Sequence, residues 1–162
     1  MSSKIIFSPQ KKTKLVSKII SEKTDAEMVE IRSLDKKEGF FNELFKNFSY
    51  KELTPNDIRP SKIDFTDDDL IIIGSPPFHG KISPSILAFI KNNDFKNKNV
   101  IIFTTTSNKE AYRILKVMKQ NIERSKGEVI NSFFMKTSNK TDDEILISTV
   151  KLVKQLDLDL YI

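Results

Sequence analysis

The sequence contains no cysteine and only one histidine, His79, among its 162 residues. Without cysteine the chain can form no disulfide, carries no thiolate nucleophile and has no cysteine-based metal site. A single histidine leaves little for a histidine metal cluster. No apolar run approaches the length of a membrane span, and the N-terminus has no signal-peptide pattern. We therefore expect a cytoplasmic protein with no metal site and no membrane partner.

Several common cofactor and catalytic motifs are also missing. No Gly-x-Gly-x-x-Gly follows the first apolar run, which excludes a dinucleotide-binding fingerprint at that place. Neither a Walker A motif nor a Gly-x-Ser-x-Gly motif occurs. A phospho-acceptor receiver domain would need acidic residues at two strand ends where this chain has Ser8 and Ser75. The sequence therefore assigns no catalytic residue.

What the sequence does contain is typical of a globular domain. Its 162 residues are 38% hydrophobic and 30% charged, enough to bury a core without a metal or a disulfide. We expect one domain over residues 1–162. The formal net charge is +5. Because the lysines are scattered rather than clustered, this charge favours a solvated surface over a nucleic-acid-binding face.

The stretch Asp67–Pro84 organises the chain. Its apolar run Leu70–Ile73 is mostly β-branched and too short for a helix, which predicts a strand buried on both faces of a parallel sheet. Gly74 and two prolines end this strand, and Phe78 follows in a turn where no core periodicity requires an aromatic residue. A Ser-Pro pair beginning at Ser83 predicts the cap and first turn of the next helix.

Apolar runs and helical periodicities alternate along the rest of the chain. Further strands are predicted at residues 4–8, 28–31, 100–103 and 129–135, and helices at residues 15–24, 41–48, 83–91, 111–126 and 142–156. Gly127 is predicted to close the helix that precedes it. Because right-handed crossovers place helices on both faces of a parallel sheet, this alternation predicts a doubly wound α/β fold.

In its middle stretch the sequence resembles the flavodoxin family. Asp69–Pro76, which reads Asp-Leu-Ile-Ile-Ile-Gly-Ser-Pro, is similar to the family's third strand, and Asp94–Val100 resembles its lead into the fourth. Pro77–Gly80 lies where the family places an aromatic residue against the flavin ring. Ser8–Thr13 occupies the place of the phosphate loop and keeps a hydroxyl at each end, although Gln-Lys-Lys replaces the usual Thr-Gly-Asn. Thr104–Asn108 matches the third flavin loop without its frequent glycines.

This resemblance implies a short-chain, flavodoxin-like three-layer sandwich with a five-stranded parallel sheet in the order 2-1-3-4-5, and FMN as the cofactor. Hydroxyls and backbone amides at a helix N-terminus suit a phosphate, and a flat apolar ring such as that of Phe78 suits a flavin. The residues implied in FMN binding are Ser8, Gln10, Lys11, Lys12, Thr13, Ser75, Pro76, Pro77, Phe78, His79, Gly80, Thr104, Thr105, Thr106, Ser107 and Asn108.

Simpler roles for some of these residues stay open at this point. Lys11 and Lys12 are also compatible with solvated positions that open a helix. Phe78 is compatible with an anchor that folds its loop onto the core, and His79 with a plain exposed loop residue. Thr104–Ser107 is compatible with a polar strand end.

Three functions are compatible with these patterns. The first is an FMN-binding electron-transfer protein that works with an unknown redox partner or small acceptor. The second is an FMN-dependent NAD(P)H reductase of quinones or nitro compounds. The third is a cofactor-free domain that uses the fold for protein interaction. The basic charge favours docking on acidic surfaces, and we expect a monomer or a homodimer.

Overall fold

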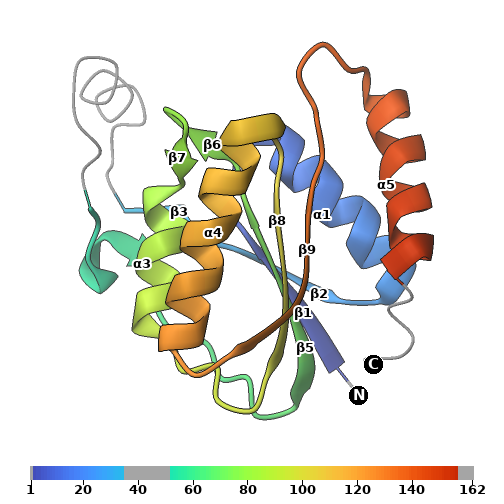
Figure 1. The fold of residues 1–162 in the computed structure, drawn as a ribbon. Coiled ribbons are helices and arrows are strands. Elements are labelled where there is room, and N and C mark those ends of the chain that lie inside the picture. The colour runs from blue at the N-terminus through green and yellow to red at the C-terminus, as the bar shows by residue number, and fades with distance from the viewer. Residues whose placement is uncertain (1, 35–51, 157–162) are drawn as a thin grey trace.

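The computed structural model describes residues 2–34 and 52–156. Its central feature is a five-stranded sheet in the order β2-β1-β5-β8-β9 (Figure 1). The strands are β1 (Ser2–Phe7), β2 (Glu27–Glu30), β5 (Asp68–Ser75), β8 (Asn99–Thr104) and β9 (Glu128–Phe134). Every neighbouring pair is parallel. The predicted strand order 2-1-3-4-5 and the flavodoxin-like α/β fold class are therefore confirmed.

Helices cover both faces of this sheet. α1 (Lys11–Thr24) and α5 (Asp142–Leu156) pack on one face, and α3 (Pro84–Asn92) and α4 (Asn108–Arg124) pack on the other (Figure 1). The helix predicted at residues 41–48 lies outside the described residues. Within residues 2–34 and 52–156, no helix combines the length and the apolar character that a membrane crossing requires.

The structure also contains short elements that the sequence did not predict. β3 (Arg32–Ser33) pairs antiparallel with β4 (Ile58–Arg59), which follows the 3-10 turn η1 (Pro55–Asp57). β6 (Pro77–Phe78) and β7 (Lys81–Ile82) form an antiparallel hairpin between β5 and α3. A two-residue ladder is too short to produce a recognisable alternation of apolar and polar residues, which explains why these pairs were missed.

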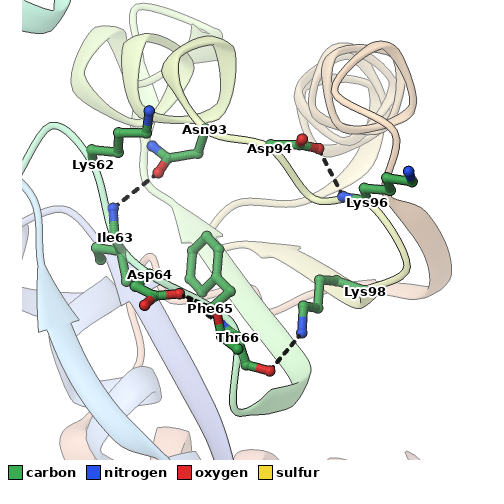
Figure 2. Close-up of a pocket in the computed structure, with 9 residues that line it drawn as sticks. All are labelled: Lys62, Ile63, Asp64, Phe65, Thr66, Asn93, Asp94, Lys96 and Lys98. Carbon is green, nitrogen blue, oxygen red and sulfur yellow. Dashed lines mark hydrogen bonds between the residues drawn. The ribbon is translucent and has the colours of Figure 1, made fainter.

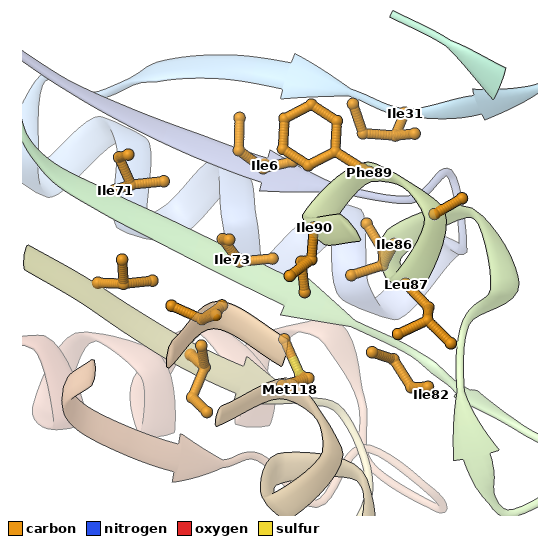
Figure 3. Close-up of a cluster of buried hydrophobic side chains, with 14 of the residues drawn as sticks. Ile6, Ile31, Ile71, Ile73, Ile82, Ile86, Leu87, Phe89, Ile90 and Met118 are labelled. Carbon is orange, nitrogen blue, oxygen red and sulfur yellow. The ribbon is translucent and has the colours of Figure 1, made fainter. Parts of the chain in front are cut away.

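β5 is buried on both faces, as its apolar run predicts. Leu70 and Ile72 point into the core beneath α1 and α5, whereas Ile71 and Ile73 point into the core beneath α3 and α4. Figure 3 shows the second of these cores, where Phe89 and its neighbours on α3 pack over Ile71 and Ile73. Full burial of one such side chain stabilises the fold by roughly 1.5–3 kcal/mol.

Gly74 leaves the space that the ring of Phe103 occupies. It pairs with Phe103 of β8, and a Cβ added to Gly74 would lie only 2.1 Å from Phe103 Cζ. The Phe103 ring also stacks on Phe133 of β9, with 5.1 Å between ring centroids and 4° between ring planes. A side chain at position 74 would therefore displace a ring that is packed on both of its sides.

The end of α4 differs in detail from the prediction. Gly127 follows the helix as expected, but the residue in the left-handed conformation is Lys126, with φ of 70°. The Lys126 amide donates to Glu123 O and the Gly127 amide to Ile122 O, each at 3.0 Å, which is the Schellman pattern. Gly127 is needed for packing instead, because a Cβ there would lie 2.8 Å from Phe95 Cβ.

We predict that Gly74→Ala lowers the free energy of unfolding by about 1–3 kcal/mol, the usual cost of overpacking a core. Urea unfolding measures this loss. The control combines Gly74→Ala with Phe103→Leu, which clears the space of the ring. When Gly74→Ala is added to the Phe103→Leu variant, the further loss in free energy of unfolding should be clearly smaller than the loss that Gly74→Ala causes in the wild type. A Gly74→Ala variant as stable as the wild type would contradict the packing described here.

Candidate functional site

The loops that follow β1, β5 and β8 meet at one edge of the sheet. In a parallel sheet the carboxyl ends of all strands share an edge, and ligands of open α/β sheets bind there. Phe7 at the end of β1 pairs with Gly74, and Ser75 at the end of β5 pairs with Thr104. Figure 1 shows the β6–β7 hairpin and the start of α4 at this same edge. The fold thus brings the three predicted loops together.

The first loop leads directly into the N-terminus of α1. Gln10 is the N-cap residue, and its Oε1 accepts hydrogen bonds from the Thr13 amide at 2.9 Å and from Thr13 Oγ1 at 3.1 Å. Ser8 is only 4% exposed, and its Oγ has no hydrogen-bond partner among the described residues. Since buried hydroxyls nearly always have a partner, this oxygen marks a place where a ligand can bind.

Lys11 and Lys12 lie in different surroundings. Lys12 Nζ contacts Asp142 Oδ1 at 3.0 Å and Lys140 O at 3.4 Å, so it ties α1 to the start of α5. The hydrogen bond and the charge of Lys12 lower the pKa of Asp142. The pair is therefore intact at neutral pH and is lost as the pH falls through that lowered pKa. Lys11 is the exposed first residue of α1. Because Lys12 is bound to Asp142, Lys11 is the lysine of this loop whose ammonium group is not held by that carboxylate.

Thr13 links the first loop to the third. Its Oγ1 lies 2.8 Å from Thr105 Oγ1, and both residues are buried. The Thr105 carbonyl accepts a hydrogen bond from Thr137 Oγ1 at 3.0 Å, and the Thr104 carbonyl accepts one from the Met135 amide at 2.9 Å. Thr104 Oγ1 is buried and has no partner within the described part of the chain. Hydrogen bonds thus join the third loop to the first loop and to the segment that follows β9.

The remainder of the third loop runs into α4. Thr106 and Ser107 are half-buried, and Asn108 is exposed with φ of 57°. Ser107 is the N-cap residue of α4, but its side chain makes no capping hydrogen bond. These polar groups therefore keep hydrogen-bonding capacity at the rim of the site.

Ser75 holds the middle loop in place. Its Oγ donates to the Pro76 carbonyl at 2.9 Å and accepts from the Ser83 amide at 2.9 Å. Ser83 begins α3 as predicted, but its hydroxyl pairs with that of Ser85 at 3.0 Å and does not cap the helix. The Ser75 hydroxyl is therefore already engaged within the protein, and it fixes the base of the segment that carries Pro77 and Phe78.

Phe78, His79 and Gly80 form the tip of this hairpin. Successive positive φ angles at His79 (48°) and Gly80 (75°) fit the two-residue turn that matches strand twist. Phe78 is half-buried and belongs to neither hydrophobic core formed by the described residues. Its ring meets the exposed His79 ring edge-on, with 5.0 Å between centroids. Within the described residues, Phe78 thus lies at the hairpin tip and outside both cores.

The loop after β9 adds contacts that the sequence did not identify. Thr137 supports Thr105, and Asp142 binds Lys12 across the site. A polar run, Thr137–Asn139, follows β9 much as Thr104–Asn108 follows β8. This similarity between the two polar runs was the signal in the sequence that could have identified the loop after β9 as part of the site.

A separate hollow of about 430 Å³ lies at the opposite edge of the sheet (Figure 2). Asp64 accepts hydrogen bonds there from the amide and the hydroxyl of Thr66, and these bonds lower the pKa of Asp64. Lys98 Nζ contacts the Thr66 carbonyl at 3.4 Å. None of the predicted site residues lines this hollow, so it is not part of the three-loop site.

Comparisons with known proteins agree on the fold. No protein-family model and no curated protein matches the chain. A Bacteroides uniformis protein provisionally described as a flavoprotein matches with a TM-score of 0.67 and 17% identity, over 93% of this chain and 97% of its own. A flavoprotein in complex with FMN from Lactobacillus acidophilus matches with a TM-score of 0.59 and 18% identity, over 82% of this chain and 92% of its own. Oxidised flavodoxin 1 from Bacillus cereus matches with a TM-score of 0.50 and 13% identity, over 97% of this chain and 100% of its own.

We predict that a double-mutant cycle on Thr13→Val and Thr105→Val gives a coupling energy of about 0.5–1.5 kcal/mol, the usual net contribution of one hydrogen bond. The free energies of unfolding of the wild type, both single variants and the double variant supply the cycle. Thr13→Val leaves the buried Thr105 hydroxyl without its partner, whereas in Thr105→Val the Thr13 hydroxyl keeps its bond to Gln10 Oε1. Because both single changes remove the same hydrogen bond, the double variant should lose less than the sum. Purely additive losses would show that the two loops are not linked in solution.

Proposed function

Because the chain has a flavodoxin-like fold, we propose that it binds FMN where its three loops meet and serves as an electron-transfer protein. The observation that carries this proposal is the buried hydroxyl of Ser8 next to the N-terminus of α1, which has no hydrogen-bond partner in the described part of the chain. Amides and hydroxyls at a helix N-terminus form a site for a phosphate. The donor groups of this place therefore suit the phosphate of FMN.

The residues around Ser8 can hold that phosphate after one local change. The Gln10 carboxamide occupies the Thr13 amide, so its exposed side chain has to swing outward before a phosphate oxygen accepts from that amide. The Ser8 hydroxyl can then donate to a second oxygen. Lys11 adds a point charge from the first residue of α1, whereas Lys12 is occupied by Asp142.

The flavin ring would lie between the middle and third loops. The Phe78 ring offers an apolar wall at the hairpin tip, and Thr104–Asn108 offers backbone and side-chain groups for the polar edge of the ring. Bound FMN supplies the redox chemistry, and the protein supplies binding, orientation and electrostatics. An electron carrier of this kind needs no catalytic side chain.

We predict that FMN binds more tightly than riboflavin, which lacks the phosphate, and that the difference shrinks as the salt concentration rises because Lys11 is exposed. Ser8→Ala should weaken FMN binding by about tenfold or more, since a hydrogen bond to a charged group contributes about 1.5–3 kcal/mol. Titration of flavin fluorescence with wild-type protein and variant measures both effects. Ser148→Ala, at an exposed position on α5, is the matched control.

The outcomes of this titration separate the competing functions. Equal affinities for FMN and riboflavin at every salt concentration would show that the Ser8 loop is not a phosphate site. No flavin binding at all would favour the cofactor-free interaction domain. If FMN binds, oxidation of NAD(P)H in the presence of a quinone would favour the reductase over the electron carrier.

We predict that Phe78→Ala weakens the binding of FMN and of riboflavin by about the same factor, roughly tenfold, because a stacked ring contributes about 0.5–1.5 kcal/mol beyond its buried area. The comparison with Ser8→Ala is informative, since that change should affect FMN alone. Circular dichroism checks that the variant is folded. A folded Phe78→Ala protein with unchanged flavin affinity would remove Phe78 from the site.

A further inference from the structure

A second surface lies outside the three-loop site, where α4 packs beside β9. Its residues line a hollow of about 610 Å³, and the buried side chains of Ile102 and Leu115 belong to this lining. β9 is the edge strand of the sheet, so no further strand among the described residues covers this side (Figure 1). We call this surface the α4–β9 face and define it by Tyr112, Lys116, Lys119, Ser132 and Phe134.

Two exposed aromatic rings rim the hollow. Tyr112 is 66% exposed and Phe134 is 37% exposed. The rings meet at 72° with 5.9 Å between their centroids. Exposed large apolar groups that gather at one place, and are flanked by polar residues, mark a surface used for interaction. The side chain of Ser132 is small, so it does not fill the hollow between α4 and β9.

The same face is basic. α4 carries five basic residues and only two acidic ones. Lys116 is exposed and has no acidic partner within 4.0 Å in the described part of the chain. Lys119 forms an exposed ion pair with Glu123 at 3.9 Å, which is long and open to solvent. The hollow is therefore an apolar depression beside two ammonium groups, of which that of Lys116 is not neutralised by the described residues.

We propose that the α4–β9 face docks an acidic protein partner, which inserts an apolar side chain into the hollow and places carboxylates against Lys116 and Lys119. Complementary charge steers such an encounter, and a buried apolar anchor supplies most of the affinity.

Other occupants fit this face less well. In a symmetric pair of two copies, the same basic residues would face each other and repel. A single-stranded nucleic acid needs aromatic faces on which bases can stack, but Tyr112 and Phe134 meet edge to face.

The α4–β9 face lies next to the proposed flavin site, but the docking proposal does not depend on flavin binding. Tyr112 lies in the first turns of α4, directly after the loop Thr104–Asn108. Arg113 reaches toward the hairpin, since its Nη1 would be 3.7 Å from a Cβ on Gly80. A partner docked here would lie beside the edge proposed for FMN, but docking requires no cofactor.

The experiment is an NMR titration of ¹⁵N-labelled protein with a short synthetic peptide that alternates glutamate and leucine. We compare Lys116→Glu/Lys119→Glu with Lys151→Glu/Lys154→Glu, which makes the same change of net charge at the same spacing on exposed positions of α5. Peptides that replace leucine by serine, or glutamate by lysine, test the apolar anchor and the charge. FMN affinity, measured on the same variants, should be unchanged in both.

The peptide should shift the resonances of the α4–β9 face, and its affinity should fall by about tenfold in Lys116→Glu/Lys119→Glu, because two charge pairs become repulsive. The peptide affinities of the α5 control and the wild type should differ by less than about twofold, since both exposed lysines on α5 are remote from the α4–β9 face. No binding, equal losses in both double variants, or resonance shifts elsewhere would each overturn the proposal. So would tighter binding of oligothymidylate at this face, or self-association that Lys116→Glu/Lys119→Glu abolishes.

Discussion

The rest of the structure depends on the burial of β5 between two layers of helices. Alternate residues of its apolar run enter opposite cores, so β5 can only be an inner strand with neighbours on both sides. Because those neighbours are parallel, the three loops that follow β1, β5 and β8 emerge at one edge. The space for this arrangement is tight, since Gly74 leaves just enough room for the ring of Phe103.

Internal hydrogen bonds then decide which polar groups of the three loops remain available to a ligand. Thr13 and Thr105 bind each other, and Ser75 supports its own loop. Gln10 caps α1 with its side chain, in the place that we propose for a phosphate. Ser8 and Thr104 keep buried hydroxyls that have no partner among the described residues. The proposed site thus leaves two oxygens unsatisfied within this part of the chain, and the lost hydrogen-bonding energy can be recovered when a ligand binds.

Charge distinguishes the two surfaces that we interpret as functional. At the proposed phosphate loop, one lysine is neutralised by Asp142 and another is exposed, so the local positive charge is modest. On the α4–β9 face, two exposed lysines lie beside an apolar hollow, and Lys116 has no acidic partner among the described residues. A small anion is suited to the first arrangement, because it needs directed donors. A protein surface is suited to the second, because it can combine several carboxylates with one apolar anchor.

The sequence by itself determined the five strands of the main sheet and the four long helices of the described residues, because burial leaves a local pattern. Leu70–Ile73 could only be a doubly buried strand, although this strand continues through Gly74 and ends at Ser75, before the prolines. The sequence also placed Ser8, Phe78 and Thr105 in the segments that follow three of these strands. Only the tertiary structure decided their partners, since hydrogen bonds such as Thr13–Thr105 join residues far apart in the chain. For the same reason no local pattern could show that Lys12 is neutralised across the site or that β9 leaves the flank of α4 uncovered.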